Sequence, residues 1–237
     1  MNSLTTILLV LLIANIWLIY MNYQKPLDNK SYLLGTYLYL GLSILIVALF
    51  TILFSNMHLE NSKNIGWILL GSFIISLFAI SFIINGKNLT VNHIAFIIFL
   101  ITIGLILAAT INVASNVPMA LLVTAVLVFI LTLITYSLSP EGLAKLVSLY
   151  PILNTLLMGL IIVLIVGLIF FRNNEIFNKY IGIFIVILFM LFILTDTAVL
   201  IIQSQLLTCK TQSCVNYPSA SLGLFLDALN IFAGLLH

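Results

Sequence analysis

Eight long apolar runs are the feature of this sequence that most constrains its fold. Each has about twenty residues with no Lys or Arg inside it, the length that an α-helix needs to cross the hydrocarbon core of a bilayer. Because backbone groups in lipid must find hydrogen-bond partners within their own segment, such runs fold as helices. We therefore expect an all-α integral membrane protein whose spans are Leu4–Tyr20, Tyr32–Phe54, Ile65–Ile84, His93–Ile111, Pro118–Leu138, Leu149–Phe171, Tyr180–Leu207 and Pro218–His237.

The composition excludes most other classes of protein. Of 237 residues, 63% are hydrophobic and 6% are charged, against about 25% charged residues in an average soluble domain. The formal net charge of +2 leaves no basic surface for nucleic acid. No GxSxG, HExxH or P-loop motif occurs in the chain. We expect neither an enzyme nor a bound cofactor.

The first run has two interpretations, a cleaved signal peptide and a retained helix. Met1–Ser3 contains no basic residue, and Leu4–Tyr20 is longer than a typical signal h-region of about 7–15 residues. No small-residue cleavage site follows it. We therefore expect residues 1–24 to form an extra N-terminal transmembrane helix or signal anchor, and residues 25–237 to form one polytopic domain.

Lys and Arg in the connections predict the orientation, because short cytoplasmic loops carry an excess of both. One set of alternate connections contains Lys25, Lys30, Lys87, Lys145 and Lys210; the other contains Lys63, Arg172 and Lys179. Five against three places the first set in the cytoplasm.

The two cysteines, Cys209 and Cys214, lie in the last connection of the first set. A pair without His or further Cys is poor material for a zinc site. Glutathione keeps cytoplasmic thiols reduced, so the predicted orientation makes us expect two free thiols.

Only two charged residues lie well inside apolar runs, Asp196 and Asp227. An ionisable residue within the bilayer costs about 2.5–3.5 kcal/mol on insertion scales and is a functional-site candidate by default. The alternative is a protonated carboxyl that holds helices together by hydrogen bonds.

The residues around these aspartates carry a family resemblance. The segments Leu194–Thr197 and Leu222–Phe232 resemble the D-T and L-Y-L-D-x-x-N-x-F patterns of the Bax inhibitor-1 family, also called the transmembrane Bax inhibitor motif family, with a Lifeguard-like C-terminal motif. Tyr37–Leu42 is similar to the start of the family's first helix, and Ala120–Ala125 is similar to its fourth. The resemblance covers residues 32–237.

The resemblance implies a seven-helix Bax-inhibitor-like bundle, to which the N-terminal helix is an addition. It also implies a pH-sensitive calcium leak channel in an intracellular membrane, of the endoplasmic reticulum or Golgi type, that modulates ion homeostasis and cell death. Asp196 and Asp227 would form a proton-sensitive latch and a weak, transient calcium site, supported by Thr195, Thr197 and Asn230. Calcium is expected to be the transported ion and not a cofactor.

One departure from the family concerns a basic residue. Some members pair an aspartate with a basic side chain on the second helix of the fold, whereas Ile65–Ile84 contains no Lys, Arg or His. We therefore expect no closed state that depends on such a pair.

A second hypothesis is a non-conducting membrane protein that acts through partners or helps to build a larger membrane assembly. Small residues such as Gly35, Gly41 or Gly104 would let partner helices approach closely. Apart from such membrane proteins, we expect contacts with lipid, calcium ions and protons.

Overall fold

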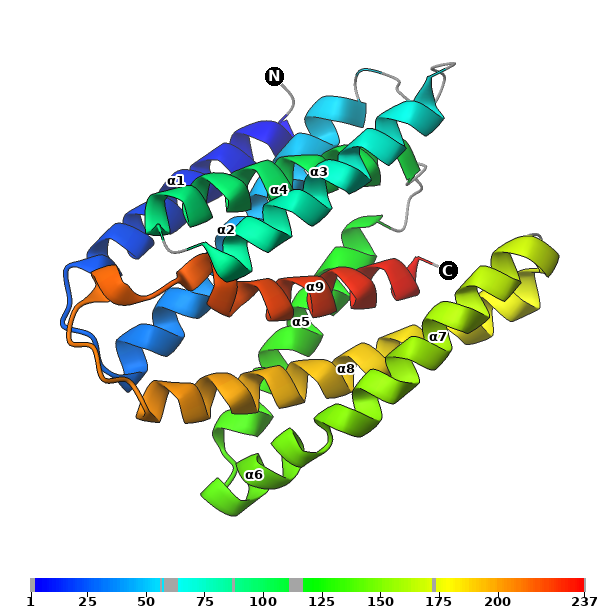
Figure 1. Ribbon diagram of the computed structural model, residues 1–237. Helices are drawn as coiled ribbons and strands as arrows, with labels where there is room; N and C mark the ends of the chain where they lie inside the picture. Colours follow the sequence, from blue (N-terminus) through cyan, green and yellow to red (C-terminus); the bar gives the residue numbers. More distant parts are fainter. Residues whose placement is uncertain are drawn as a thin grey trace. The chain divides into compact units, whose positions relative to one another are not determined.

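The computed structural model describes residues 3–55, 57, 64–86, 88–110, 117–171 and 174–236. Regular structure within these ranges is helical, and eight of its helices are long and apolar enough to cross a membrane, which confirms the all-α membrane fold (Figure 1). The elements are α1 Ser3–Tyr23, α2 Asn29–Ser55, α3 Ile65–Asn85, α4 Leu89–Thr110, α5 Val117–Tyr136, α6 Pro140–Ser148, α7 Tyr150–Phe170, α8 Glu175–Gln205, the short 3-10 turn η2 Gln212–Cys214, and α9 Tyr217–Leu235.

The helices belong to two compact units. One comprises residues 1–114 and 207–222, and the other comprises residues 115–206 and 223–237. In the first unit α1 packs against α2, and α4 packs against both α2 and α3. In the second unit α8 packs against α5, α6 and α7.

Three glycines of the first unit lie at close helix contacts. A Cβ atom at Gly104 would come within 2.8 Å of the Cβ of Phe50 on α2, and one at Gly41 would come within 3.0 Å of the amide nitrogen of Asn15 on α1. A Cβ atom at Gly35 would enter the ring of Tyr217. These positions therefore serve packing within the chain, and the expectation that they dock partner helices is wrong.

The start of α2 carries a reciprocal cap. The Asp28 carboxylate accepts a hydrogen bond from the backbone N–H of Ser31 at 2.7 Å, and the Ser31 hydroxyl accepts one from the backbone N–H of Asp28 at 2.8 Å. This arrangement satisfies donors that the first turn of a helix leaves free. The Ser31 hydrogen bonds hold the pKa of the Asp28 carboxyl below its ordinary value.

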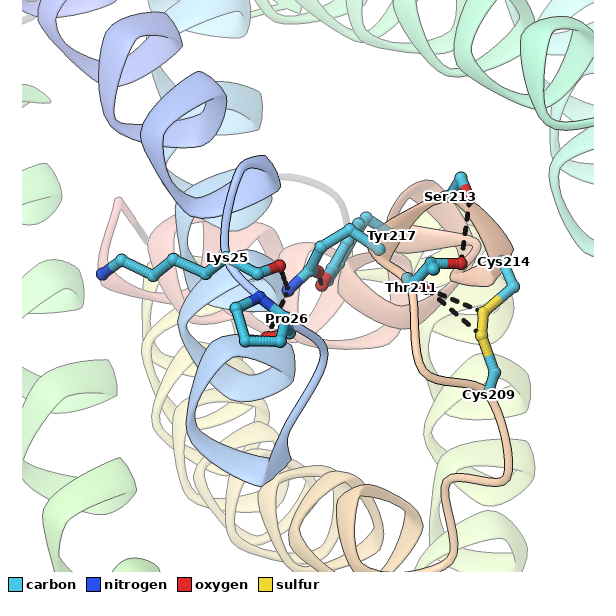
Figure 2. The surroundings of a disulfide bond; sticks show 8 residues. Lys25, Pro26, Cys209, Thr211, Ser213, Cys214 and Tyr217 are labelled. Atoms are coloured by element: carbon cyan, nitrogen blue, oxygen red, sulfur yellow. Dashed lines mark hydrogen bonds between the residues drawn. A yellow bond between two sulfur atoms is a disulfide. The ribbon is translucent and has the colours of Figure 1, made fainter.

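The connection between α8 and α9 lies against the connection between α1 and α2 (Figure 2). The backbone N–H of Leu27 donates to the carbonyl of Lys210 at 3.2 Å, and the Gln212 side chain donates to the carbonyl of Lys25 at 3.3 Å. Gln212 also accepts a hydrogen bond from the hydroxyl of Tyr217. These two connections therefore lie at the same end of the unit, as an even number of intervening spans requires.

Cys209 and Cys214 form a disulfide, so the expectation of free thiols is wrong (Figure 2). The turn η2 brings their Cα atoms to 6.6 Å, within the range that a bridge can span. The expectation of free thiols rested on an orientation predicted from a small charge imbalance between the connections. Because disulfides persist in oxidising compartments, we expect this connection to face the non-cytoplasmic side.

Helix α6 in the second unit is the element that a search for apolar runs misses. Its N-cap residue Ser139 accepts a hydrogen bond from the N–H of Gly142, Pro140 occupies the first turn, and Glu141 and Lys145 stand at the ends that suit their charges. The helix is amphipathic and short, so its sequence contains no long apolar run. It leads into α7, and the two together form one span, Pro140–Gly167.

Candidate functional site

Asp196 and Asp227 lie well inside two helices, α8 and α9, that one connection joins. Asp196 is nine residues before Gln205, where α8 ends, and Asp227 is ten residues after Tyr217, where α9 begins. At a rise of 1.5 Å per residue these offsets are about 14 Å and about 15 Å. Each carboxyl group therefore lies well away from the helix end that the connection joins.

The second unit brings the two carboxyl groups close enough to interact with each other. Gly223 makes the approach possible, because a Cβ atom at this position would collide with Oδ2 of Asp196. Gly223 precedes Asp227 by four residues, so both lie on one face of α9. The absence of a side chain at Gly223 leaves room for the Asp196 carboxyl beside Asp227.

Asp227 is the more enclosed of the two. Its side chain is 6% exposed, and its Oδ2 atom is a buried oxygen without a hydrogen-bond partner among the described residues. A buried carboxyl oxygen without a partner is costly. It is satisfied when it carries a proton that it can donate, or when a cation approaches.

Tyr150 is a member of this cluster that the sequence analysis missed. Its hydroxyl donates a hydrogen bond to Oδ1 of Asp196, and its ring meets the ring of Phe192 edge to face at a centroid distance of 6.2 Å. Tyrosines at the ends of apolar runs usually mark the membrane interface, which concealed this one. The local sequence sets Tyr150 apart only by its position directly before Pro151, at the start of the apolar run Leu149–Phe171.

The three supporting residues expected from the sequence are buried or partly buried on the same two helices. The Thr195 hydroxyl donates to the carbonyl of Phe192 at 2.8 Å, and the Asn230 amide donates to the carbonyl of Leu226 at 2.8 Å. Thr197 is 1% exposed. The hydrogen bonds of Thr195 and Asn230 therefore fall within their own helices and not on either aspartate.

The chemistry open to the cluster is that of two neighbouring carboxyl groups, which can share a proton and whose oxygens can bind a cation. Two carboxylates in contact within a low-dielectric bundle repel when both are ionised, so the pair favours sharing one proton. When that proton leaves, two negative charges face each other with a neutral phenol beside them. Such a pair either separates or recruits a cation.

Comparisons with known proteins bear on the whole polytopic region. The family model described as "Inhibitor of apoptosis-promoting Bax1" matches residues 29–237. No curated protein and no solved structure matches the chain. The matched region includes α2 to α9, with both aspartates and Tyr150, and begins after α1.

Proposed function

Because this chain belongs to the Bax inhibitor-1 family, a family of membrane proteins in cell-death and ion regulation, we propose that it is a pH-sensitive calcium leak channel. The membrane that we propose is an intracellular one, of the endoplasmic reticulum or Golgi type. In this proposal the protein lets calcium move down its gradient and so modulates ion homeostasis and cell death. It performs no catalytic step.

The observation that carries the proposal is the contact between Asp196 and Asp227 in the interior of two apolar helices. Burying two carboxyl groups costs free energy that a purely structural contact between apolar side chains would avoid. A shared proton removes one of the two negative charges, so the closed arrangement persists. Loss of the proton leaves two repelling charges, which separate the helices locally and open the passage.

Calcium is the cargo in this proposal. Calcium prefers six to eight oxygen ligands, which is more than two carboxylates provide. Asp196 and Asp227 would therefore hold the ion weakly, and water would supply the remaining ligands. Weak binding suits passage, because an ion that binds tightly does not leave.

The test is calcium flux into liposomes that contain the purified protein and an enclosed calcium indicator, measured from pH 5 to pH 8. Wild-type flux should rise with pH. Asp196→Asn and Asp227→Asn should each lose this dependence, and the double variant should add little, because a coupled pair acts as a unit. Glu141→Gln, which neutralises an exposed carboxylate on α6, is the control and should keep the wild-type profile.

Two results would contradict the proposal in different ways. Absence of wild-type flux at every pH would remove the leak function and leave a non-conducting protein that acts through partners. Flux whose pH profile survives in both single variants would retain a channel and remove the aspartate pair as its pH sensor.

A further inference from the structure

Tyr150 and Asp227 both interact with the Asp196 carboxyl, and they do so from different helices. The Tyr150 hydroxyl donates to Oδ1, while Oδ2 lies against Gly223 on the face of α9 that carries Asp227. Among the described residues, these are the titratable side chains that interact with Asp196. One carboxyl group thus connects α7, α8 and α9.

Both the ring and the hydroxyl of Tyr150 contact residues of α8. Phe192 and Asp196 are four residues apart and share one face of α8, so the phenol ring contacts the first and its hydroxyl reaches the second. A side chain held at both ends presents its O–H group in one direction. This geometry differs from that of an interfacial tyrosine, whose hydroxyl faces water.

Tyr150 also occupies a break between helices. Only Leu149 separates the end of α6 from the start of α7, and its backbone N–H turns back to the carbonyls of Leu146 and Val147. Pro151 has no N–H group to continue the α6 hydrogen-bond ladder. A change in direction between α6 and α7 would therefore move the Tyr150 hydroxyl directly.

We propose that Tyr150 is a positioning residue of the aspartate pair, which holds Asp196 through its hydroxyl and couples the charge state of the pair to α7. The proposal rests on the proposed pH-sensitive function. A phenol that donates to a carboxylate stabilises the ionised form. Asp196 is therefore the member that carries the charge in the closed state, and Asp227 carries the shared proton on the side away from Tyr150.

The decisive variant is Tyr150→Phe, which keeps the ring against Phe192 and removes only the hydroxyl. A hydrogen bond to a charged group is equivalent to about one pH unit or more. Without it the pair holds its proton to higher pH, so the midpoint of calcium flux should move upward by about one unit. Tyr136→Phe, at an exposed tyrosine of the same unit, should leave the midpoint unchanged.

A spectroscopic readout separates this proposal from the flux hypothesis. The protonated carboxyl group has an infrared band, which can be identified by its loss in Asp227→Asn. The pH dependence of this band can be measured whether or not the protein conducts calcium. Its midpoint should move upward by about one pH unit in Tyr150→Phe whether or not flux occurs. In the Asp196→Asn background the same substitution should have no effect on the band.

A second perturbation covers the case in which Tyr150→Phe does not fold. Replacing all tyrosines by 3-fluorotyrosine makes the phenol a stronger donor, so the band midpoint of otherwise wild-type protein should move downward. Unchanged band midpoints in both the phenylalanine variant and the fluorinated protein would overturn the proposal. Absent flux together with the expected shifts would overturn only the channel function.

Discussion

Replacement of Gly35 by Ala tests the packing that holds the α8–α9 connection in place. The Cβ atom would come within 2.6 Å of Cζ and 2.8 Å of Oη of Tyr217, whereas ordinary contact begins at 3.4 Å. The ring or the helix must therefore move by at least about 0.8 Å, the difference between 3.4 and 2.6. Tyr217 is 1% exposed and stacks on Tyr39 at 5.4 Å, so its ring has little room to move.

Two opposing terms decide the size of the effect. Overpacking of a buried site costs about 1–3 kcal/mol, and replacing a helical glycine by alanine contributes about 0.8–1 kcal/mol in favour of the helix. The net change at Gly35 is a destabilisation of up to about 2 kcal/mol. For a chain of this length that corresponds to a Tm lower by up to about 4–8 °C.

The assay is thermal unfolding of the purified protein in detergent, with Gly71→Ala on α3 as the matched control. Among the described residues, no neighbouring side chain or other helix comes within 4 Å of a Cβ at Gly71, so the control keeps the helix-propensity gain without the clash. Its Tm should equal or exceed that of the wild type. A Gly35→Ala protein at least as stable as the Gly71→Ala protein would refute the packing argument.

Three further predictions concern the connections. Alkylation before and after reduction should find Cys209 and Cys214 bridged in protein from native membranes, and two thiols that react without reduction would contradict this. An impermeant amine reagent should label Lys210 from the non-cytoplasmic side and Lys179, at the other end of α8, from the cytoplasmic side; the reverse pattern would restore the orientation predicted from charge. The cap at the start of α2 lowers the pKa of the Asp28 carboxyl in the folded protein. The stabilisation from this cap is therefore complete above the ordinary pKa of about 4, and it is lost as the pH falls through the lowered pKa of the folded state. Asp28→Asn should therefore reduce the acid dependence of Tm, and an unchanged dependence would show that the cap does not contribute.

The apolar runs allowed the long helices to be predicted from the sequence, because a bilayer demands both a minimum length and internal hydrogen bonding from every span. Ile65–Ile84, for example, differs by one residue from α3. The same reasoning isolated Asp196 and Asp227, since a charge inside such a run is conspicuous without any knowledge of its neighbours. Helix α6 escaped prediction because its amphipathic pattern is not the pattern of a span.

The contacts between helices were decided only by the tertiary structure, since they join residues that are distant in the chain and have no common local signal. Tyr150 lies 46 residues before Asp196, and no periodicity relates the two. Gly35 is explained by Tyr217, and the bridge between Cys209 and Cys214 by the turn between them, not by the charge of the loops. A bilayer selects helices by length and apolarity, but which polar group meets which inside the bundle depends on how the helices pack.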